Sequence, residues 1–111
     1  MTAKDLFQRY LGQCPLIAII RGVTPDEADA IGDAIYESGI RIVEVPLNSP
    51  DPLTSIERLA KRFGETVLVG AGTVLDVAAV GRVRDAGGRI IVSPNTNTDV
   101  IAATAEGGLV S

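Results

Sequence analysis

The sequence of 111 residues is 46% hydrophobic and 22% charged, which is the composition of one small globular domain. A net charge of −4, only two tyrosines and two phenylalanines, and no cluster of Lys and Arg argue against a nucleic-acid surface. The one cysteine, Cys14, excludes an internal disulfide. The lack of histidine excludes Cys/His metal sites and histidine-based catalytic triads, although not oxygen-only ion sites.

The N-terminal segment, residues 1–13, contains no apolar core of a signal peptide, and no later stretch approaches about 18 consecutive apolar residues. We therefore expect a cytoplasmic location and no membrane partner. In this segment Leu6, Phe7, Tyr10 and Leu11 recur at helical spacing. They predict a leader helix, within residues 1–14, that covers one end of the fold.

Four short apolar runs, each followed by a longer segment with helix signals, occupy the rest of the chain. The runs are rich in β-branched residues and too short for helices, so we predict strands at residues 15–22, 40–47, 66–74 and 89–94. The predicted helices cover residues 24–39, the stretch from Ser49 and Pro50 to Gly64, the stretch from Asp76 to residue 87, and residues 99–107.

This alternation of strands and helices predicts an α/β fold with a parallel sheet, because each helix must return the chain to the same edge. A doubly wound open sheet and part of a closed (β/α)8 TIM barrel both satisfy that pattern. Polar residues lie at the carboxyl end of every predicted strand: Arg21, Glu44 with Asn48, Thr73, and residues 93–95. Barrel enzymes collect site residues from consecutive strands at that edge, so the barrel is favoured.

Only about half of such a barrel is expected within these 111 residues. Residues 1–14 would form the leader helix, and residues 15–111 would form four βα units with the start of a fifth strand at "GGLVS". We therefore interpret the chain as the N-terminal half of a barrel. Its two unpaired sheet edges and uncovered inner face would promote association.

Glu44 is the one carboxylate inside the predicted strand 40–47. Strand alternation puts it on the face opposite Val43 and Val45, and the all-aliphatic side should meet the helices. Glu44 would then point into the barrel, where low dielectric raises a carboxyl pKa toward neutrality and suits it to general acid/base catalysis. The alternative is a structural ion pair with Arg21 on the neighbouring strand.

Four motifs, "PLIAIIRGVTPDEA", "VEVPLNSP", "VGAGTVL" and "IVSPN", stand in this order along the chain. In these motifs the sequence resembles the Schiff-base (class I) aldolases of 2-keto-3-deoxy-6-phosphosugar acids, from about residue 15 onward. The resemblance implies a (β/α)8 barrel, usually a trimeric homo-oligomer, that reversibly cleaves the phosphosugar acid to pyruvate and glyceraldehyde 3-phosphate. It implies no metal and no other cofactor.

The resemblance also implies roles for three residues. Glu44 matches the family's glutamate acid/base, Arg21 matches the arginine of "IRG" that binds substrate, and Thr73 matches the threonine of "GAGT" that contacts the pyruvyl end. Taken without the family, Thr73 could equally be a β-branched residue bonded to a backbone carbonyl. Gluconate-type members usually carry "EVTLRT", with an arginine where this chain has Asn48, which favours the galactonate-type branch. Asn48 and Asn95 are otherwise expected to be turn residues at the barrel mouth.

A Schiff-base aldolase needs a lysine whose amine is neutral near pH 7, which demands burial or a cationic neighbour. Lys4 lies in the leader segment and Lys61 on the outer face of its helix, so we expect neither to be the nucleophile. In the family that lysine comes from strand 6 and the phosphate site from strands 7 and 8. The chain alone is therefore expected to be inactive. Two further hypotheses are a non-catalytic half-barrel that associates with another chain and a fragment of another phosphosugar-binding barrel enzyme.

Overall fold

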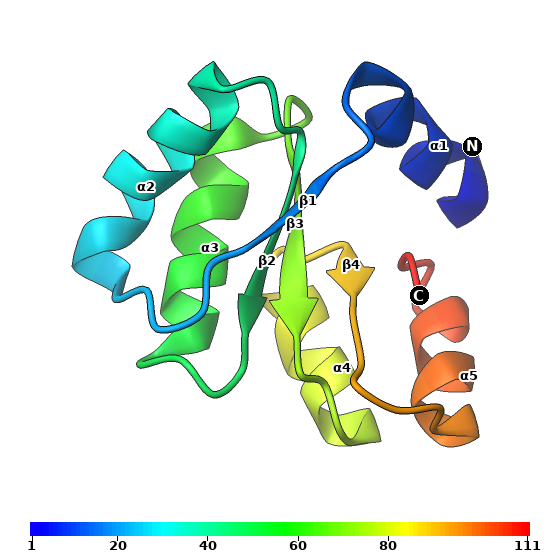
Figure 1. Ribbon diagram of the computed structural model, residues 1–111. Helices are drawn as coiled ribbons and strands as arrows, with labels where there is room; N and C mark the ends of the chain where they lie inside the picture. Colours follow the sequence, from blue (N-terminus) through cyan, green and yellow to red (C-terminus); the bar gives the residue numbers. More distant parts are fainter.

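The structure is a computed structural model that describes residues 1–111 as four strands and five helices. In chain order the elements are α1 (Ala3–Gln13), β1 (Ile17–Ile19), α2 (Pro25–Glu37), β2 (Ile42–Pro46), α3 (Pro52–Phe63), β3 (Leu68–Gly72), α4 (Val77–Asp85), β4 (Ile90–Ile91) and α5 (Thr98–Glu106). The four predicted βα units and the leader helix are all present (Figure 1).

The strands form one parallel sheet in the order β1-β2-β3-β4, which confirms the α/β fold with a parallel sheet. The register places Ile19, Glu44, Gly70 and Ile90 in one row across the four strands. A parallel bridge between Ile90 and Val110 adds a further residue beside β4. The strands end at one edge of the sheet, which points downward in Figure 1 and is called the carboxyl edge below.

The main core lies between the sheet and helices α2 to α5. It contains 16 buried residues, among them Val43 and Val45 of β2, which face Ile56 and Leu59 of α3 across the same cluster. Full burial of one such aliphatic side chain contributes about 1.5–3 kcal/mol to folding. We call this side of the sheet the outer face.

The opposite side of the sheet, the inner face, is covered by α1 at its amino end. Tyr10 of α1 is fully buried there in a second apolar cluster, together with Ile42, Leu68, Ile90 and Val110. Partly buried Leu6, Phe7 and Leu11 pack against the same cluster. These contacts confirm the leader helix and its place over one end of the fold.

Strand β1 leaves part of the inner face open. Ile17 and Ile19 pair in register with Ile42 and Glu44, so their side chains share the inner face, yet they are 39% and 60% exposed. The far edge of β1 has no neighbouring strand. An apolar strand with an unpaired edge is a surface on which another strand can add.

Three elements, β1, β4 and α3, differ most from the sequence-based expectations. The strands β1 and β4 contain only three and two residues, because each apolar run is longer than the part that pairs in the ladder. Helix α3 does not begin at Ser49 and Pro50. It begins at Pro52 after Asp51, whose backbone is in the left-handed region at φ 44°. The side chain of Ser49 instead accepts a hydrogen bond from the backbone of Gly22, beside the site described below.

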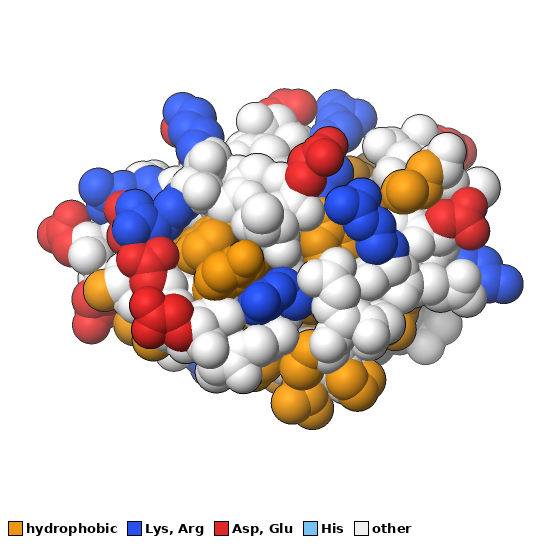
Figure 2. Space-filling view, turned by 90° about the horizontal axis from the view of Figure 1, so that it is seen from above, with side chains coloured by type: hydrophobic (Ala, Val, Ile, Leu, Met, Phe, Trp, Pro, Cys, Tyr) orange, Lys and Arg blue, Asp and Glu red, His pale blue; other side chains and the backbone are white.

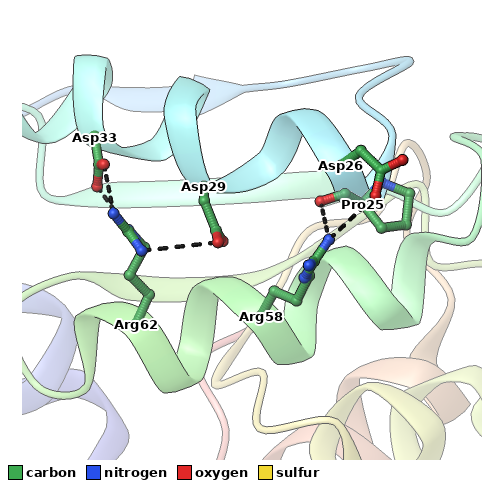
Figure 3. A network of polar contacts seen from close by, with 6 residues as sticks. All are labelled: Pro25, Asp26, Asp29, Asp33, Arg58 and Arg62. Atoms are coloured by element: carbon green, nitrogen blue, oxygen red, sulfur yellow. Dashed lines mark hydrogen bonds and ion pairs between the residues drawn. The ribbon is translucent and has the colours of Figure 1, made fainter.

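Two arginines of α3 tie this helix to α2 across the outer layer (Figure 3). Arg62 donates to both carboxylate oxygens of Asp33, at 2.8 and 2.7 Å, and lies 3.7 Å from Asp29. Arg58 pairs with Asp26 at 3.6 Å. The side chains of these pairs are partly or fully exposed, so each pair adds little free energy and the network mainly fixes how the two helices lie together.

The surface carries mixed charge. Figure 2 looks onto the end opposite the carboxyl edge, where Lys and Arg side chains alternate with Asp and Glu side chains and hydrophobic groups show between them. Neither sign of charge forms a continuous stripe on this face. None of the five helices has the length and apolar character that a membrane crossing requires.

Candidate active site

Glu44 is a buried carboxylate in the middle of β2. Its neighbours Val43 and Val45 belong to the core of the outer face, and Glu44 therefore points to the inner face, as strand alternation predicted. The residue is 3% exposed, and Oε2 has no hydrogen-bond partner. Burial raises the pKa of Glu44 because it disfavours the charged form, and the positive charge of Arg21 opposes this in part. A raised pKa brings a carboxyl group closer to the pH at which an enzyme works, as general acid/base catalysis requires.

The glycines of β3 make room for Glu44 and for β4. Gly72 lies on the same face as Glu44, and a Cβ at Gly72 would collide with Oε1, Oε2 and Cδ of the Glu44 side chain. A Cβ at Gly70 would collide with the backbone carbonyl of Ile90. Both glycines thus allow close packing inside the sheet. The space over Gly72 that holds the carboxyl group of Glu44 is called the Gly72 notch below.

Arg21 lies in the turn after β1, at the carboxyl edge, and is exposed. Its Nη1 donates a hydrogen bond of 3.0 Å to Oδ1 of Asn48, in the loop after β2. Its charge acts on Glu44 from a distance, while Oε2 of Glu44 has no hydrogen-bond partner. A structural ion pair between Arg21 and Glu44 would place a hydrogen bond on Oε2. The structure shows no such bond, so it does not support this alternative.

Thr73 follows directly after the last residue of β3 and is half-buried. Its φ of 56° lies in the left-handed region, which is rare for a β-branched residue. Such a conformation costs on the order of 1–3 kcal/mol and is found preferentially at binding and catalytic sites. Thr73 is thus held in a strained turn at the carboxyl edge, next in sequence to Gly72.

The structure brings the three predicted site residues to one region. Arg21, Glu44 and Thr73 belong to, or follow, the consecutive strands β1, β2 and β3, and the amide of Ile20 donates to the carbonyl of Glu44 at 3.1 Å. Asn95 follows β4 at the same edge and is exposed. Arg21 and Thr73 thus lie at the carboxyl edge, and Glu44 lies between them on β2, two residues before the end of the strand.

Ser49 was missed as a member of this region, because the sequence marked it only as a helix opener. Its Oγ accepts a hydrogen bond of 2.9 Å from the backbone N–H of Gly22, and the residue is only 7% exposed. The bond joins the loop after β1 to the loop after β2. No pattern in the sequence reveals it, because its two ends are 27 positions apart.

The two lysines lie away from this region. Lys4 is exposed in α1, which covers the amino end of the sheet. Lys61 is exposed near the end of α3 and pairs with Glu57 at 3.1 Å. Both positions confirm that neither amine is buried, and neither shares the carboxyl edge with Glu44.

Comparison with known proteins now adds to this geometry. The sequence model of the family described as KDPG and KHG aldolase matches residues 7–109. The chain belongs to this family. Among other members, the probable 2-dehydro-3-deoxy-6-phosphogalactonate aldolase of Rhizobium meliloti (strain 1021) is 50% identical over 97 residues, which are 87% of this chain and 46% of the relative. The 2-dehydro-3-deoxy-6-phosphogalactonate aldolase of Escherichia coli (strain K12) is 46% identical over 87 residues, 78% of this chain and 42% of the relative.

The fold is also that of the KDPG and KHG aldolases. A solved structure described as native KDPGal superposes with a TM-score of 0.85 at 42% identity, over 87% of this chain and 47% of that chain. The chain spans about half the length of the curated relatives it matches, 46% and 42% of the two proteins above. The parallel four-stranded sheet with its helices is accordingly a half of the family's TIM barrel.

Proposed function

We propose that this chain supplies the acid/base part of a class I aldolase that reversibly cleaves 2-keto-3-deoxy-6-phosphogalactonate to pyruvate and glyceraldehyde 3-phosphate. The observation that carries the proposal is Glu44, a buried carboxyl group with a raised pKa and an unpartnered oxygen, on the inner face of a half-barrel. The substrate is taken from the names of the relatives that are 50% and 46% identical to this chain.

The reaction needs a lysine that these 111 residues do not place near Glu44, because Lys4 and Lys61 are both exposed. We therefore assign the nucleophile to a segment outside them, and we call a polypeptide that contains this chain and that segment the completed aldolase. In it the lysine attacks the C2 ketone, and the resulting iminium accepts the electrons released when the C3–C4 bond breaks.

Glu44 moves the protons of this reaction. It serves as acid and base while the carbinolamine loses water, and it then accepts the proton of the C4 hydroxyl as the C3–C4 bond breaks. Arg21 orients the substrate through its planar guanidinium, which suits a carboxylate, and Thr73 donates a hydrogen bond to the pyruvyl portion. The scheme uses no metal and no cofactor. A trimeric homo-oligomer, a cytoplasmic location and a place in galactonate degradation belong to the same proposal.

A second candidate function is that of a non-catalytic half-barrel that associates with another chain. One observation favours it: the inner face beside β1 is open, with Ile17 and Ile19 exposed by 39% and 60% at an unpaired strand edge. The two candidates differ in whether a reactive lysine meets Glu44 in the assembled protein.

Trapping with pyruvate and borohydride tests the proposal, because borohydride reduces an iminium to a stable amine that mass spectrometry detects. The completed aldolase should be labelled once per chain and saturably, and it should release pyruvate faster from the galactonate than from the gluconate epimer. The 111-residue chain alone should give no saturable adduct. Variants Lys4→Arg and Lys61→Arg of the short chain are matched controls, since each removes one amine and keeps the charge.

Two results would overturn the proposal. An unlabelled completed aldolase would remove the Schiff-base mechanism and favour the non-catalytic half-barrel. Saturable labelling of the short chain that disappears in one of the two arginine variants would show that an assembly of this chain buries its own lysine, contrary to the assignment of the nucleophile.

A further inference from the structure

Arg21 lies at the carboxyl edge and is held by a neutral group. Arg41 and Arg89 also bond to neutral oxygen atoms, but they precede β2 and β4, at the amino end of the sheet. Arg58, Arg62 and Arg84 each lie within 4.0 Å of a carboxylate, at 3.6, 2.7 and 3.5 Å. Arg21 instead donates its hydrogen bond to the neutral side-chain carbonyl of Asn48, at 3.0 Å. A guanidinium has five N–H donors, so this bond fixes the group while leaving its charge and most of its donors free.

The backbone beside Arg21 is fixed as well. Gly22, the next residue, has a φ of 85° that favours glycine, and its N–H donates to Oγ of Ser49 at 2.9 Å. Ser49 is 7% exposed, and its own N–H donates to the carbonyl of Pro46 at 3.0 Å. Consecutive residues 48 and 49 thus hold the side chain of Arg21 and the backbone that follows it. Two hydrogen bonds from the loop after β2 restrict where the guanidinium can lie.

The charge held in this way reaches the candidate site. Arg21 follows β1, the strand that pairs with β2, and its positive charge opposes the effect of burial on the pKa of Glu44. Asn48 leaves that charge uncompensated. An aspartate at the same position would bind the guanidinium through a charge-assisted pair and neutralise it.

We propose that Asn48 is a positioning residue that holds the guanidinium of Arg21 at the carboxyl edge, with its remaining N–H groups free to bind the carboxylate of a 2-keto acid. The inference rests on the proposed function for the identity of that acid, and it revises the expectation that Asn48 is only a turn residue. Neutrality of the side chain at position 48 is the essential property. A residue that merely tethered the two loops would be replaced without loss by aspartate, because aspartate binds arginine more strongly.

The test uses the 111-residue chain with pyruvate as the probe, and it needs neither turnover nor a lysine. Pyruvate is added to chain labelled with ¹⁵N, and the Nε–Hε signal of Arg21 is followed by NMR, with the uncharged amide of pyruvate as the ligand control. The wild-type signal should shift saturably with pyruvate and not with the amide. Asn48→Asp should weaken pyruvate binding by about tenfold or more, the value of one lost charge-assisted contact, while the melting temperature stays equal or rises.

Two further variants complete the experiment. Asn48→Ala frees the guanidinium without neutralising it, so it should weaken binding by less than Asn48→Asp does. Asn95→Asp is the matched control, because it adds the same charge at the same edge, where Asn95 is exposed. Its pyruvate affinity should stay within about twofold of the wild type, as expected for a screened surface charge.

The inference is overturned if wild-type chain shows no saturable shift, or if Asn48→Asp binds pyruvate as tightly as wild type does. It is also overturned if Asn95→Asp loses as much affinity as Asn48→Asp, because general charge repulsion would then explain both. Failure of the proposed function gives a different result. If only the proposed function fails, pyruvate still binds at Arg21 and still binds more weakly to Asn48→Asp. The completed aldolase, however, neither forms an iminium nor cleaves the sugar acid.

Discussion

Substitution of Gly72 by alanine tests directly whether the Gly72 notch sets the position of Glu44. The added Cβ would meet Oε1, Oε2 and Cδ of Glu44, all inside the 3.0 Å below which real Cβ contacts essentially never fall. The backbone of Gly72 has no positive φ, so alanine introduces no backbone strain there. The carboxyl group is the far end of a flexible side chain, so it must leave the notch and can do so at little cost to the fold.

The expected effect on catalysis follows from the size of this displacement. A misplacement of about 1 Å of a catalytic group lowers the rate by on the order of 10²-fold, so the kcat of the completed aldolase should fall about 100-fold in Gly72→Ala. Pyruvate release in a coupled assay gives kcat. In the 111-residue chain, an NMR titration should show the raised pKa of Glu44 moving back toward its ordinary value as the carboxyl group reaches water.

Two controls separate displacement from general damage. Gly81→Ala in α4 adds a methyl group with no atom within 4 Å, so it should leave kcat unchanged and stabilise the helix by roughly 0.5–1 kcal/mol. Glu44→Asp shortens the side chain that the new methyl group would meet, so Gly72→Ala should reduce kcat less in that background. The reasoning is refuted if Gly72→Ala keeps the wild-type kcat. It is also refuted if Gly72→Ala lowers kcat by the same factor in the wild-type and the Glu44→Asp backgrounds.

The remaining predictions concern stability and pH. The hydrogen bonds from Arg62 lower the pKa of Asp33 below 3.8 in the folded chain, so their stabilisation is present above that value and is lost as the pH falls through the lowered pKa. Arg62→Ala should therefore have a lower melting temperature than wild type at neutral pH, and the difference should shrink in acid below 3.8; a difference that is constant with pH would contradict this. Glu44 has the opposite sign, because burial raises its pKa above 4.5 and stability is lost as the pH rises through the raised value. Glu44→Gln should melt higher than wild type at about pH 8 and lose this advantage in acid, whereas a lower melting temperature at about pH 8 would show that the carboxylate is stabilised by its surroundings.

Local rules account for what the sequence predicted correctly. Strand alternation alone put Glu44 opposite Val43 and Val45, because the side-chain period of a strand is fixed at two. The spacing of Leu6 and Tyr10 likewise identified the buried side of α1. These features depend on neighbours within a few residues, so one sequence contains the information.

The features that were missed depend on distant partners. Helix α3 begins at Pro52 and not at Ser49 with Pro50, and Oγ of Ser49 instead accepts a hydrogen bond from Gly22 in the loop after β1. The contact between Gly72 and the carboxyl group of Glu44 likewise depends on a distant pairing, the register of β2 with β3. Both contacts follow from how the strands pair, which local periodicity does not specify.

The central claim, that Glu44 is the acid/base of an aldolase, is tested most directly by the kinetics of Glu44→Gln in the completed aldolase. Glutamine keeps the shape of the side chain in the Gly72 notch and removes the proton that titrates. We predict that kcat falls by about 10² to 10⁴-fold, that KM changes little, and that the pH dependence assigned to this group disappears from the rate. A Glu44→Gln enzyme with near-normal kcat and an unchanged pH profile would contradict the account.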